Sequence, residues 1–482
     1  MRALPLVVAA LLIAGCTTHS AVPCTTDGDC ASYAGAVCEH TFCARVDLAA
    51  PPGSDMTALD GPAMCSDASL CGIAKPICGA DQMCHPCVIG DDAKCASRDP
   101  KAPHCDASGE CVACKVNADC PLAQPICQPD GSCRGCQSHP ECASGICNLD
   151  GSCAAMGDVV YVDNVNGTCS SAVTHAGTSS DGYCDIDTAI ANLGSHHFIR
   201  VAASSSAYPQ VDVGGGSFSI VGPGGKSAKV SGVMNAAGIT VHGTAQLTLD
   251  GLEVTGGLAG QAGVVCTGAT PPPTLTLVRM LVDGVAGTGV NATSCKVILD
   301  RDQLGPGDAG GGLILSGSQF MITNSLIVGN ASGSSPGVSF GAGSVPIPPA
   351  IVGFLHNTVA GNSLGVTSAG GISCAPAGTT IANSIVWGNS KSAGTQLSGA
   401  CTLTYVDTDD APPPSGTGNN NLPPDFVASG SNNYHLNGKT AGNLACCIDK
   451  IPSSPVNHDY AGQPRPQPVM GEWDIGADEV VQ

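Results

Sequence analysis

The chain has 482 residues, of which 29 are cysteine, and its 39 acidic and 18 basic side chains give a formal net charge of −21. This acidic balance disfavours nucleic acid and other polyanions as partners, because such ligands are bound by basic surfaces. So many cysteines also exclude a reducing cytosol, and we expect an exported protein with disulfides.

The N-terminus has the pattern of a secretory signal. Arg2 is followed by the apolar run Leu4–Ile13, by two small residues and then by Cys16. The run is about half of the roughly twenty residues that a bilayer requires, so residues 1–15 are expected to be a cleaved signal peptide and not a membrane span.

The residues Leu12-Ile13-Ala14-Gly15-Cys16 resemble a bacterial lipobox, although the lipobox usually has Leu at the place of Ile13. The resemblance implies that Cys16 becomes the N-terminal residue, carries the lipid and anchors the chain to a membrane, with residues 16–23 as a tether. By analogy with enteric sorting, Thr17 and Thr18 favour the outer membrane or cell surface. The alternative is an ordinary signal peptide with a chance cysteine.

Twenty cysteines between residues 24 and 153 form five groups of four. The first group occupies residues 24–45, a linker rich in Pro, Ala and Asp follows at 46–64, and four further groups occupy residues 65–153. Units this short cannot bury enough apolar surface to fold alone, so we expect two disulfides to stabilise each one. The order of the cysteines leaves the connectivity open.

These groups resemble short cysteine-rich repeats in surface lipoproteins of myxobacteria and related bacteria, a likeness of spacing that implies a fold and no particular activity. Two groups have an Asp-Gly step before the last cysteine, at Asp130-Gly131 and Asp150-Gly151. Such steps could supply calcium ligands, but we prefer turn formation, because turns require Asp and Gly. No metal site or other cofactor is predicted.

After Met156 the composition changes, and short Val/Ile/Leu runs recur between turns rich in Gly, Asn and Ser. The clearest three segments begin at Asn324, Asn357 and Asn383, 33 and 26 residues apart. This spacing is the period of a parallel β-helix with loops of variable length, in which asparagines at equivalent turns can form hydrogen-bonded ladders. We therefore predict an all-β, right-handed parallel β-helix of the pectate-lyase-like type over residues 157–482.

Both ends of this domain fit the prediction. Residues 185–193 place apolar side chains at helical spacing and could cap the first coil as a short helix. The segment near the C-terminus, Asp474-Ile475-Gly476-Ala477-Asp478-Glu479, resembles the Asp-Ile-Gly-Ala-x-Glu signature at the C-terminus of bacterial β-helix surface proteins. The resemblance implies the fold, and that family has no single activity.

Eight cysteines remain in the β-helix region, and their order suggests local pairs. The expected pairs are Cys169 with Cys184, Cys266 with Cys295, and Cys374 with Cys401. Cys446 and Cys447 are adjacent, so they either form a vicinal disulfide or break this simple pairing.

Parallel β-helices commonly bind or cut polysaccharides, and the best catalytic candidates are Asp300 and Asp302. On one strand their carboxylates would share a face about 7 Å apart, a separation suited to an inverting hydrolase. For a lyase the nearest candidates are Arg279 and Asp283. Arg301 between the two acids favours ionised carboxylates over the protonated acid that hydrolysis needs, so we prefer a solvated ion pair on an outward face.

Trp387 is a candidate platform for sugar stacking, because it alternates with inward residues of its segment. The predicted function is that of a non-catalytic, lipid-anchored surface protein, whose stalk presents the β-helix for adhesion or for envelope and matrix interaction. Its partner would be a polysaccharide or a surface protein. The alternative is a polysaccharide lyase or glycoside hydrolase acting along the groove of the β-helix.

Overall fold

We describe the protein from a computed structural model. It describes residues 36–39, 42–45 and 65–481, except 68–70, 73, 166–168, 170–174, 233–235, 258–259, 269, 333–335, 365–369, 376–378, 391–394 and 469–470. The expected signal peptide and Cys16 therefore lie outside the described residues. Among the helices of the described part, none is long and apolar enough to cross a membrane. The chain divides into two compact units, residues 1–111 and 112–482.

In its described residues, the first unit consists of short antiparallel hairpins and one helix. The hairpins pair β1 (Ala36–Glu39) with β2 (Phe42–Arg45), β3 (Ile77–Cys78) with β4 (Cys84–His85), and β5 (His104–Cys105) with β6 (Cys111–Val112). Helix α1 (Asp92–Arg98) buries Cys95. The interior of this unit is a cluster of Ile77 with four cysteines, so disulfides take the place of an apolar core.

Every cysteine group within residues 65–153 is closed in the same way. The first cysteine pairs with the third and the second with the fourth, which settles the connectivity that the sequence leaves open. The bonds are Cys65–Cys78, Cys71–Cys84, Cys87–Cys105, Cys95–Cys111, Cys114–Cys127, Cys120–Cys133, Cys136–Cys147 and Cys142–Cys153. Both Asp-Gly steps form turns, because Asp130 and Asp150 accept hydrogen bonds from the backbone N–H and hydroxyl of the serine two residues later.

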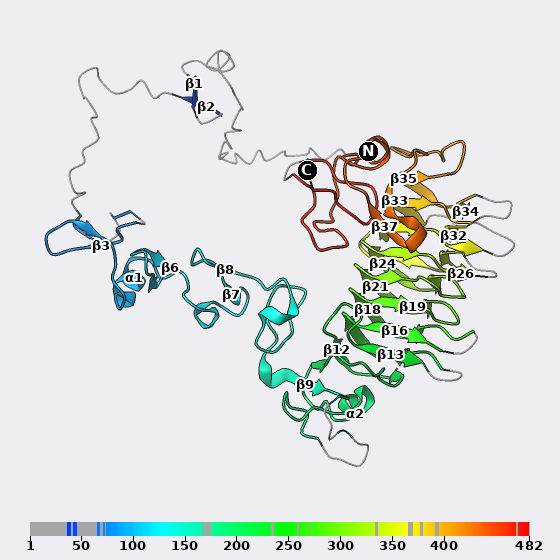
Figure 1. The fold of residues 1–482 in the computed structure, drawn as a ribbon, viewed down its shortest axis with the longest axis horizontal. Coiled ribbons are helices and arrows are strands. Elements are labelled where there is room, and N and C mark those ends of the chain that lie inside the picture. The colour runs from blue at the N-terminus through cyan, green and yellow to red at the C-terminus, as the bar shows by residue number, and fades with distance from the viewer. Residues whose placement is uncertain are drawn as a thin grey trace, which may run out of the picture. The chain divides into compact units, whose positions relative to one another are not determined.

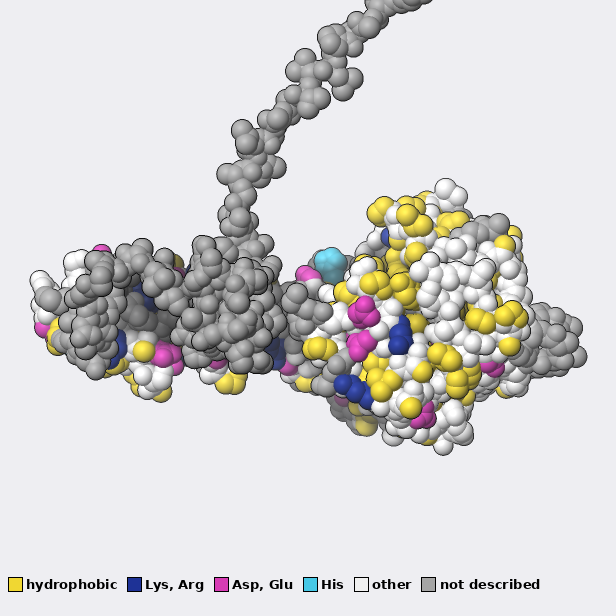
Figure 2. Space-filling view, turned by 90° about the horizontal axis from the view of Figure 1, so that it is seen from above, with side chains coloured by type: hydrophobic (Ala, Val, Ile, Leu, Met, Phe, Trp, Pro, Cys, Tyr) yellow, Lys and Arg dark blue, Asp and Glu magenta, His cyan; other side chains and the backbone are white. Residues whose placement is uncertain are grey.

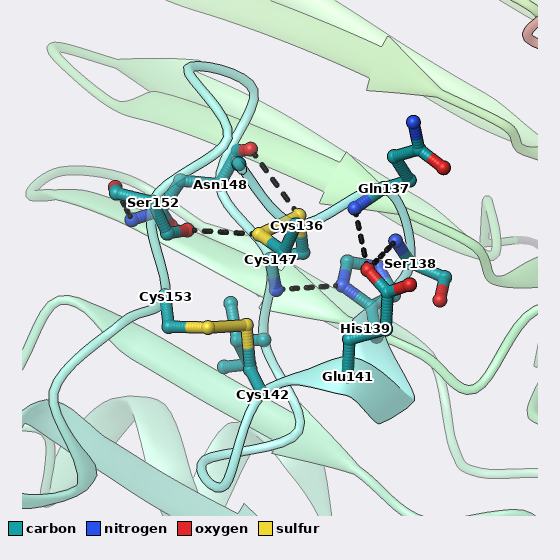
Figure 3. Close-up of a disulfide and its surroundings, with 12 residues drawn as sticks. Cys136, Gln137, Ser138, His139, Glu141, Cys142, Cys147, Asn148, Ser152 and Cys153 are labelled. Atoms are coloured by element: carbon teal, nitrogen blue, oxygen red, sulfur yellow. Dashed lines mark hydrogen bonds between the residues drawn. A yellow bond between two sulfur atoms is a disulfide. The ribbon is translucent and has the colours of Figure 1, made fainter. Parts of the chain in front are cut away.

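The second unit begins with the last two cysteine groups. Their short elements are η3 (Asn117–Asp119), β7 (Ile126–Cys127), β8 (Cys133–Arg134), η4 (His139–Glu141) and η5 (Met156–Asp158). Figure 3 shows the two disulfides of the last group, with η4 beside them. By packing, the chain therefore divides near residue 111, before the change of composition at Met156.

The rest of the second unit is a parallel β-solenoid, which confirms the predicted all-β fold class (Figure 1). Each coil contributes a strand to an 8-stranded parallel sheet, here called sheet 1, and strands to a second sheet, here called the bent sheet, which turns a corner. Sheet 1 comprises β11 (Val211–Val213), β14 (Ile239–Gly243), β17 (Val264–Gly268), β20 (Val290–Thr293), β23 (Leu313–Ser316), β27 (Val338–Phe340), β32 (Ile372–Cys374) and β34 (Leu397–Gly399).

The bent sheet has strands on both sides of its corner. Before the corner lie β9 (Val159–Val162), β10 (Phe198–Val201), β12 (Ser217–Val221), β15 (Gln246–Asp250), β18 (Thr274–Val278), β21 (Lys296–Asp300), β24 (Gln319–Thr323), β28 (Val345–Pro346) and β29 (Phe354–Leu355). After it lie β13 (Lys229–Gly232), β16 (Glu253–Gly256), β19 (Leu281–Asp283), β22 (Gln303–Leu304), β25 (Leu326–Val328) and β30 (Thr358–Ala360), whereas β33 (Thr380–Trp387) and β35 (Thr402–Thr408) run through it. A small parallel pair, β26 (Ala331–Ser332) with β31 (Ser363–Leu364), extends two coils.

Apolar residues at equivalent places in successive coils fill the interior. Alternate residues of each strand point inward, and parallel pairing in register stacks them on their counterparts. One buried row runs through Ile199, Ile220, Leu249, Leu277, Leu299, Ile322, Phe354, Ile381 and Leu403.

The corner of the bent sheet is made by one residue per coil in the left-handed conformation. These residues are Arg279, Arg301, Asn324, His356, Asn383 and Tyr405, with φ between 49 and 62°. Non-glycine residues rarely adopt this conformation, and Asn tolerates it better than most. His356, and not Asn357, occupies the corner, so the predicted alignment of Asn357 with Asn324 is wrong by one residue.

An asparagine ladder forms at the far end of the same segments, where the alignment is correct. The amide of Asn330 donates to Oδ1 of Asn362 at 2.9 Å, and the amide of Asn362 donates to Oδ1 of Asn389 at 2.8 Å. Asn389 in turn donates to Oε1 of Gln396 at 2.7 Å. The ladder thus satisfies buried amides from coil to coil.

Helix α2 (Ile186–Ala191) lies within the segment expected to cap the solenoid, next to β9 (Figure 1). Asp185 begins it by accepting a hydrogen bond from the backbone N–H of Thr188, and Ile186 and Ala189 are buried. After β35 the chain forms β36 (Phe426–Ala428), η6 (Ser429–Ser431), β37 (Asn433–Leu436) and α3 (Ala441–Cys446). The remaining cysteines form the expected pairs, Cys169–Cys184, Cys266–Cys295 and Cys374–Cys401, and the vicinal bond Cys446–Cys447.

Candidate ligand-binding groove

The outward face of the bent sheet carries uncharged polar side chains in register. One row is formed by Ser217, Gln246 and Thr274, and the row beside it by Ser219, Thr248 and Thr276. Neighbouring strands lie about 4.8 Å apart, so similar hydrogen-bonding groups repeat at that interval across these strands. In the next strand, β21, the two rows continue with Lys296 and Ile298.

Two adjoining hollows of about 320 and 370 Å³ lie over these rows. The first is lined by His197, Phe198, Ser217, Phe218, Ser219, Gln246, Leu247, Thr248, Thr274 and Thr276. The second is lined by Ile146, Cys147, Asn148, Leu149, Asp150, Phe198, Ser219, Val221, Thr248 and Asp250. Because Phe198, Ser219 and Thr248 line both, the hollows form one surface depression, here called the groove.

The last cysteine group supplies one wall of the groove. Asn148, Leu149 and Asp150 rise from this group over the sheet, and Leu149 is 65% exposed. Phe198, which is partly exposed, pairs with Ser219 at the end of the second row and packs against the cluster of Ile146 and Val221. A ligand in the groove would therefore meet hydroxyl and amide groups on the floor and apolar surface at the wall.

The lining of the groove contains no lysine or arginine. Its acidic members are Asp150, which caps its own turn, and Asp250, which is buried and paired with Arg279. The exposed His197 pairs with Asp158 at 2.9 Å. The solenoid surface visible in Figure 2 likewise has few charged side chains among many uncharged ones. These features suit a neutral ligand rich in hydroxyl groups better than an anionic one.

Asp300 and Asp302 do not project from one strand, contrary to the sequence prediction. Asp300 ends β21, and Arg301 turns the chain at the corner before Asp302. Asp302 is fully buried and accepts hydrogen bonds from the backbone N–H groups of Met280 and Asp300 at 2.8 and 3.1 Å. Burial raises the pKa of Asp302 well above its usual value. Asp302 thus holds the backbone at the corner. The prediction that it lies on a solvated outward face is also wrong.

The carboxylate of Asp300 is surrounded by donors. It accepts from Arg301 Nε at 2.9 Å and from the amide of Asn324 at 3.1 Å, and it lies 3.0 Å from Nε2 of His458. Burial raises the pKa of Asp300, but the hydrogen bond and charge of His458 and the charge of Arg301 bring it down to about 2. The group therefore stays ionised and cannot serve as a general acid.

The two lyase candidates lie in separate contacts. Arg279 occupies the corner after β18 and donates through Nε to Asp250 at 2.8 Å. Asp283 lies in β19, 3.5 Å from Nζ of Lys226. The structure therefore does not bring Arg279 and Asp283 together as a base and a calcium ligand.

Trp387 ends β33 and is partly buried against a cluster of the C-terminal segment. The cluster consists of Ile385, Leu436, Cys446, Cys447, Ile451 and Ile475, and Trp473 packs against it as well. Neither tryptophan lines the groove. We therefore assign both side chains to packing at the C-terminal end of the solenoid.

The sequence contains a signal for the floor of the groove. Strands β12, β15 and β18 each place Ser or Thr between two buried apolar residues, in the segments FSI, LTL and LTL. Repetition of that pattern at the coil period marks an outward hydroxyl row. No sequence pattern predicts the wall of the groove, because Leu149 and Thr248 are distant in the chain and only the tertiary fold brings them to the same hollow.

A family of unknown function, DUF8331, matches residues 52–160. The match covers the cysteine groups from Cys65 to Cys153 and ends within the first solenoid strand, β9. No curated protein and no solved structure matches the chain.

Proposed function

We propose that this protein binds a neutral polysaccharide in the groove without cleaving it. The observation that carries the proposal is the lining of the groove, in which hydroxyl and amide groups surround the aromatic ring of Phe198 and no basic side chain is present. Sugar hydroxyls match the floor as hydrogen-bonding partners, and an aromatic face suits the apolar side of a pyranose ring.

We further propose that the chain acts as a lipid-anchored protein of the cell envelope, in the outer membrane or at the cell surface. The support for this placement comes from the sequence around Cys16 and from the cysteine content, which requires an oxidising compartment. The disulfide-closed groups would then act as a stalk between the anchor and the β-solenoid. A protein on a cell surface is the second class of partner that we propose for the groove.

A binding role is favoured over hydrolysis because the predicted site offers no suitable acid, and over elimination because Arg279 and Asp283 are engaged in separate ion pairs. Asp300 is held ionised by His458 and Arg301, and Asp302 is closed off from solvent. Hydrolysis of a glycosidic bond needs one protonated and one ionised carboxyl group on the same substrate. We expect no new reducing ends and no unsaturated uronates from a broad polysaccharide panel. Turnover that disappears in Asp300→Asn would favour the enzyme instead.

Affinity electrophoresis tests the binding proposal. The protein is run through gels that contain hydroxyethyl cellulose, laminarin or polygalacturonate, and we expect retardation in at least one neutral glucan and none in the uronate. Thr248→Trp should abolish the retardation by filling the floor of the groove, since Thr248 lines both hollows. The matched control is Thr240→Trp, at an outward position of β14 in sheet 1, and it should have no effect. Equal retardation of both variants would contradict the proposal.

A further inference from the structure

The last cysteine group packs directly against the solenoid. Ile146 and Ala154 form a buried cluster with Val159 and Val221. The hydroxyl of Tyr161 also donates to the backbone carbonyl of Ser144 at 3.4 Å. Apolar contacts hold the group in place, but because they are non-directional they do not by themselves fix its orientation.

His139 adds a directional contact to this interface. The ring is buried, and its Nδ1 accepts a hydrogen bond from the backbone N–H of Cys147 at 3.1 Å (Figure 3). Its Nε2 lies 3.3 Å from Oδ2 of Asp250 and 3.1 Å from Nη2 of Arg279. Since Nδ1 is the acceptor, the proton of a neutral ring is on Nε2, and of the two groups next to Nε2 only Oδ2 of Asp250 can accept it, because Nη2 of Arg279 is itself a donor. His139 thereby joins the backbone of the cysteine group to a carboxylate of the solenoid.

Asp250 is held firmly from the solenoid side. It ends β15, is buried, and accepts hydrogen bonds from Nε and Nη2 of Arg279. Burial raises the pKa of Asp250, but hydrogen bonds from His139 and Arg279 outweigh this effect and bring the pKa below its usual value. The positive charge of Arg200 in β10 also acts on this carboxylate. An ionised and fixed Asp250 is a strong acceptor for the ring of His139.

The backbone that His139 holds continues into the wall of the groove. Cys147 is bonded to Cys136, and Asn148 and Leu149 follow it along the rim. The N–H of Asn148 donates to the carbonyl of Ser152 at 2.8 Å, so this turn is closed on itself and moves with Cys147. A displacement at His139 therefore reaches the wall within two residues.

We propose that His139 is a positioning residue for the groove, which fixes the wall of Asn148 and Leu149 through Cys147 and Asp250 and so determines which glycan the groove accepts. The inference rests on the proposed function. His139 does not line the groove itself, so its effect on a ligand is indirect. The last cysteine group is then part of the binding site and not only part of a stalk.

A double-mutant cycle on the full chain tests the inference, with variants His139→Asn, Asp250→Asn and the two combined. Asn at position 139 can still accept from Cys147 through Oδ1, but it is too short to reach Asp250. The matched control is His242→Asn, which removes another His–Asp contact, to Asp212 at 3.1 Å, on sheet 1. The quantity measured is the ratio of retention on hydroxyethyl cellulose to retention on laminarin, two neutral glucans of different linkage.

We expect His139→Asn to change this ratio by about threefold or more, and the combined variant to change it no further than Asp250→Asn does alone, because the contact of His139 with Asp250 is already lost there. A general loss of stability would lower both retentions and leave the ratio as it was. A ratio equal to that of His242→Asn would overturn the inference.

Hydrogen exchange separates this inference from the proposed function. If neither glucan retains the wild-type protein, the proposed function fails, but the exchange rate of the Cys147 amide still decides the role of His139. Faster exchange in Asp250→Asn than in His242→Asn supports the positioning role, and equal rates refute it.

Discussion

Arg465 and Glu479 form an ion pair that is closed to solvent: Nη1 lies 3.4 Å from Oε2, and neither side chain has exposed surface. Arg465 also donates through Nη2 to the carbonyl of Gly476 at 2.9 Å, and its Nη1 lies 3.0 Å from Nδ1 of His356 at the corner. The backbone N–H of Gly476 donates to the carbonyl of Asn383 at 2.9 Å. The Asp-Ile-Gly-Ala-x-Glu segment therefore fastens the C-terminal part of the chain to the corner of the solenoid.

Replacing Arg465 should destabilise the solenoid strongly. We expect Arg465→Met to lower the free energy of unfolding by about 3–5 kcal/mol, because the buried carboxylate of Glu479 loses its positively charged partner. Adding Glu479→Gln should recover part of the loss. Urea unfolding followed by circular dichroism measures both, with the exposed Lys439→Met as the control. A loss in Arg465→Met no larger than in that control would count against the role of the ion pair.

Asp308 makes the stability of the solenoid depend on pH. It is fully buried, Oδ1 accepts from the backbone N–H of Val285 at 3.1 Å, and Oδ2 has no hydrogen-bond partner among the described residues. Burial, with a smaller effect of the nearby Asp283, raises the pKa of Asp308 to about 8. An unfolded Asp has a pKa of about 3.9, so the folded state binds this proton more tightly. The resulting stability is complete below about pH 4 and is lost as the pH rises through 8.

The melting temperature should accordingly be lower at pH 9 than at pH 5. Asp308→Asn has no proton to lose, so its melting temperature should fall less over the same range. Between pH 5 and pH 9 the free energy of unfolding of the wild-type protein should fall by on the order of a few kcal/mol more than that of Asp308→Asn. Scanning calorimetry at the two pH values measures it, and parallel falls would show that Asp308 does not titrate as expected.

Reduction should affect the parts of the chain differently, since they rest on different forces. Residues 65–133 depend on disulfides and should become sensitive to protease in strong reductant without denaturant. The solenoid has a continuous apolar interior and should survive as a large fragment. The last cysteine group should be cut more slowly than the others, because Ile146 packs against Val221. Mass spectrometry of the fragments gives the order, and simultaneous loss of all parts would contradict it.

Lipid attachment is expected at Cys16. Cells grown with labelled palmitate should attach the label to the protein, and Cys16→Ser should abolish the labelling, because the expected lipobox attaches its lipid through the thiol of Cys16. Cys16→Ser leaves residues 1–15 unchanged, so we expect the variant still to be exported, and its export is the control. Label that persists in the variant would show that the anchor lies elsewhere.

The fold could be predicted from the sequence because a solenoid repeats its pattern locally. Each coil has the same alternation of apolar and polar residues, and the order of the cysteines gave the pairs that the solenoid contains. The one-residue error at His356 arose because Asn was expected at every corner. The corner requires only a left-handed residue, and His356 fills it with support from Arg465 and Ser454.

The candidate site could not be predicted in the same way. Asp300 and Asp302 looked like a pair because they are two residues apart, but the corner at Arg301 turns one of them inward. The contact of His139 with Asp250 joins residues that are far apart in the chain and share no sequence pattern. Tertiary contacts of this kind carry no local periodicity, so only the folded chain places the groove.

The pairing of first with third and second with fourth cysteine also bears on how the chain responds to mechanical force. The two bonds of the group Cys114–Cys133 overlap, so a pull on both its ends is carried by two parallel routes, one through the bond Cys114–Cys127 and one through the bond Cys120–Cys133. Either route bypasses one loop with a separation of 13, so the group as a whole withholds roughly 45 Å of extended chain. While the bonds are intact the groups can lengthen little under tension. A reductant would release the stored length of a group only after both of its bonds are broken, so that the reach of the chain would change before its solenoid unfolds.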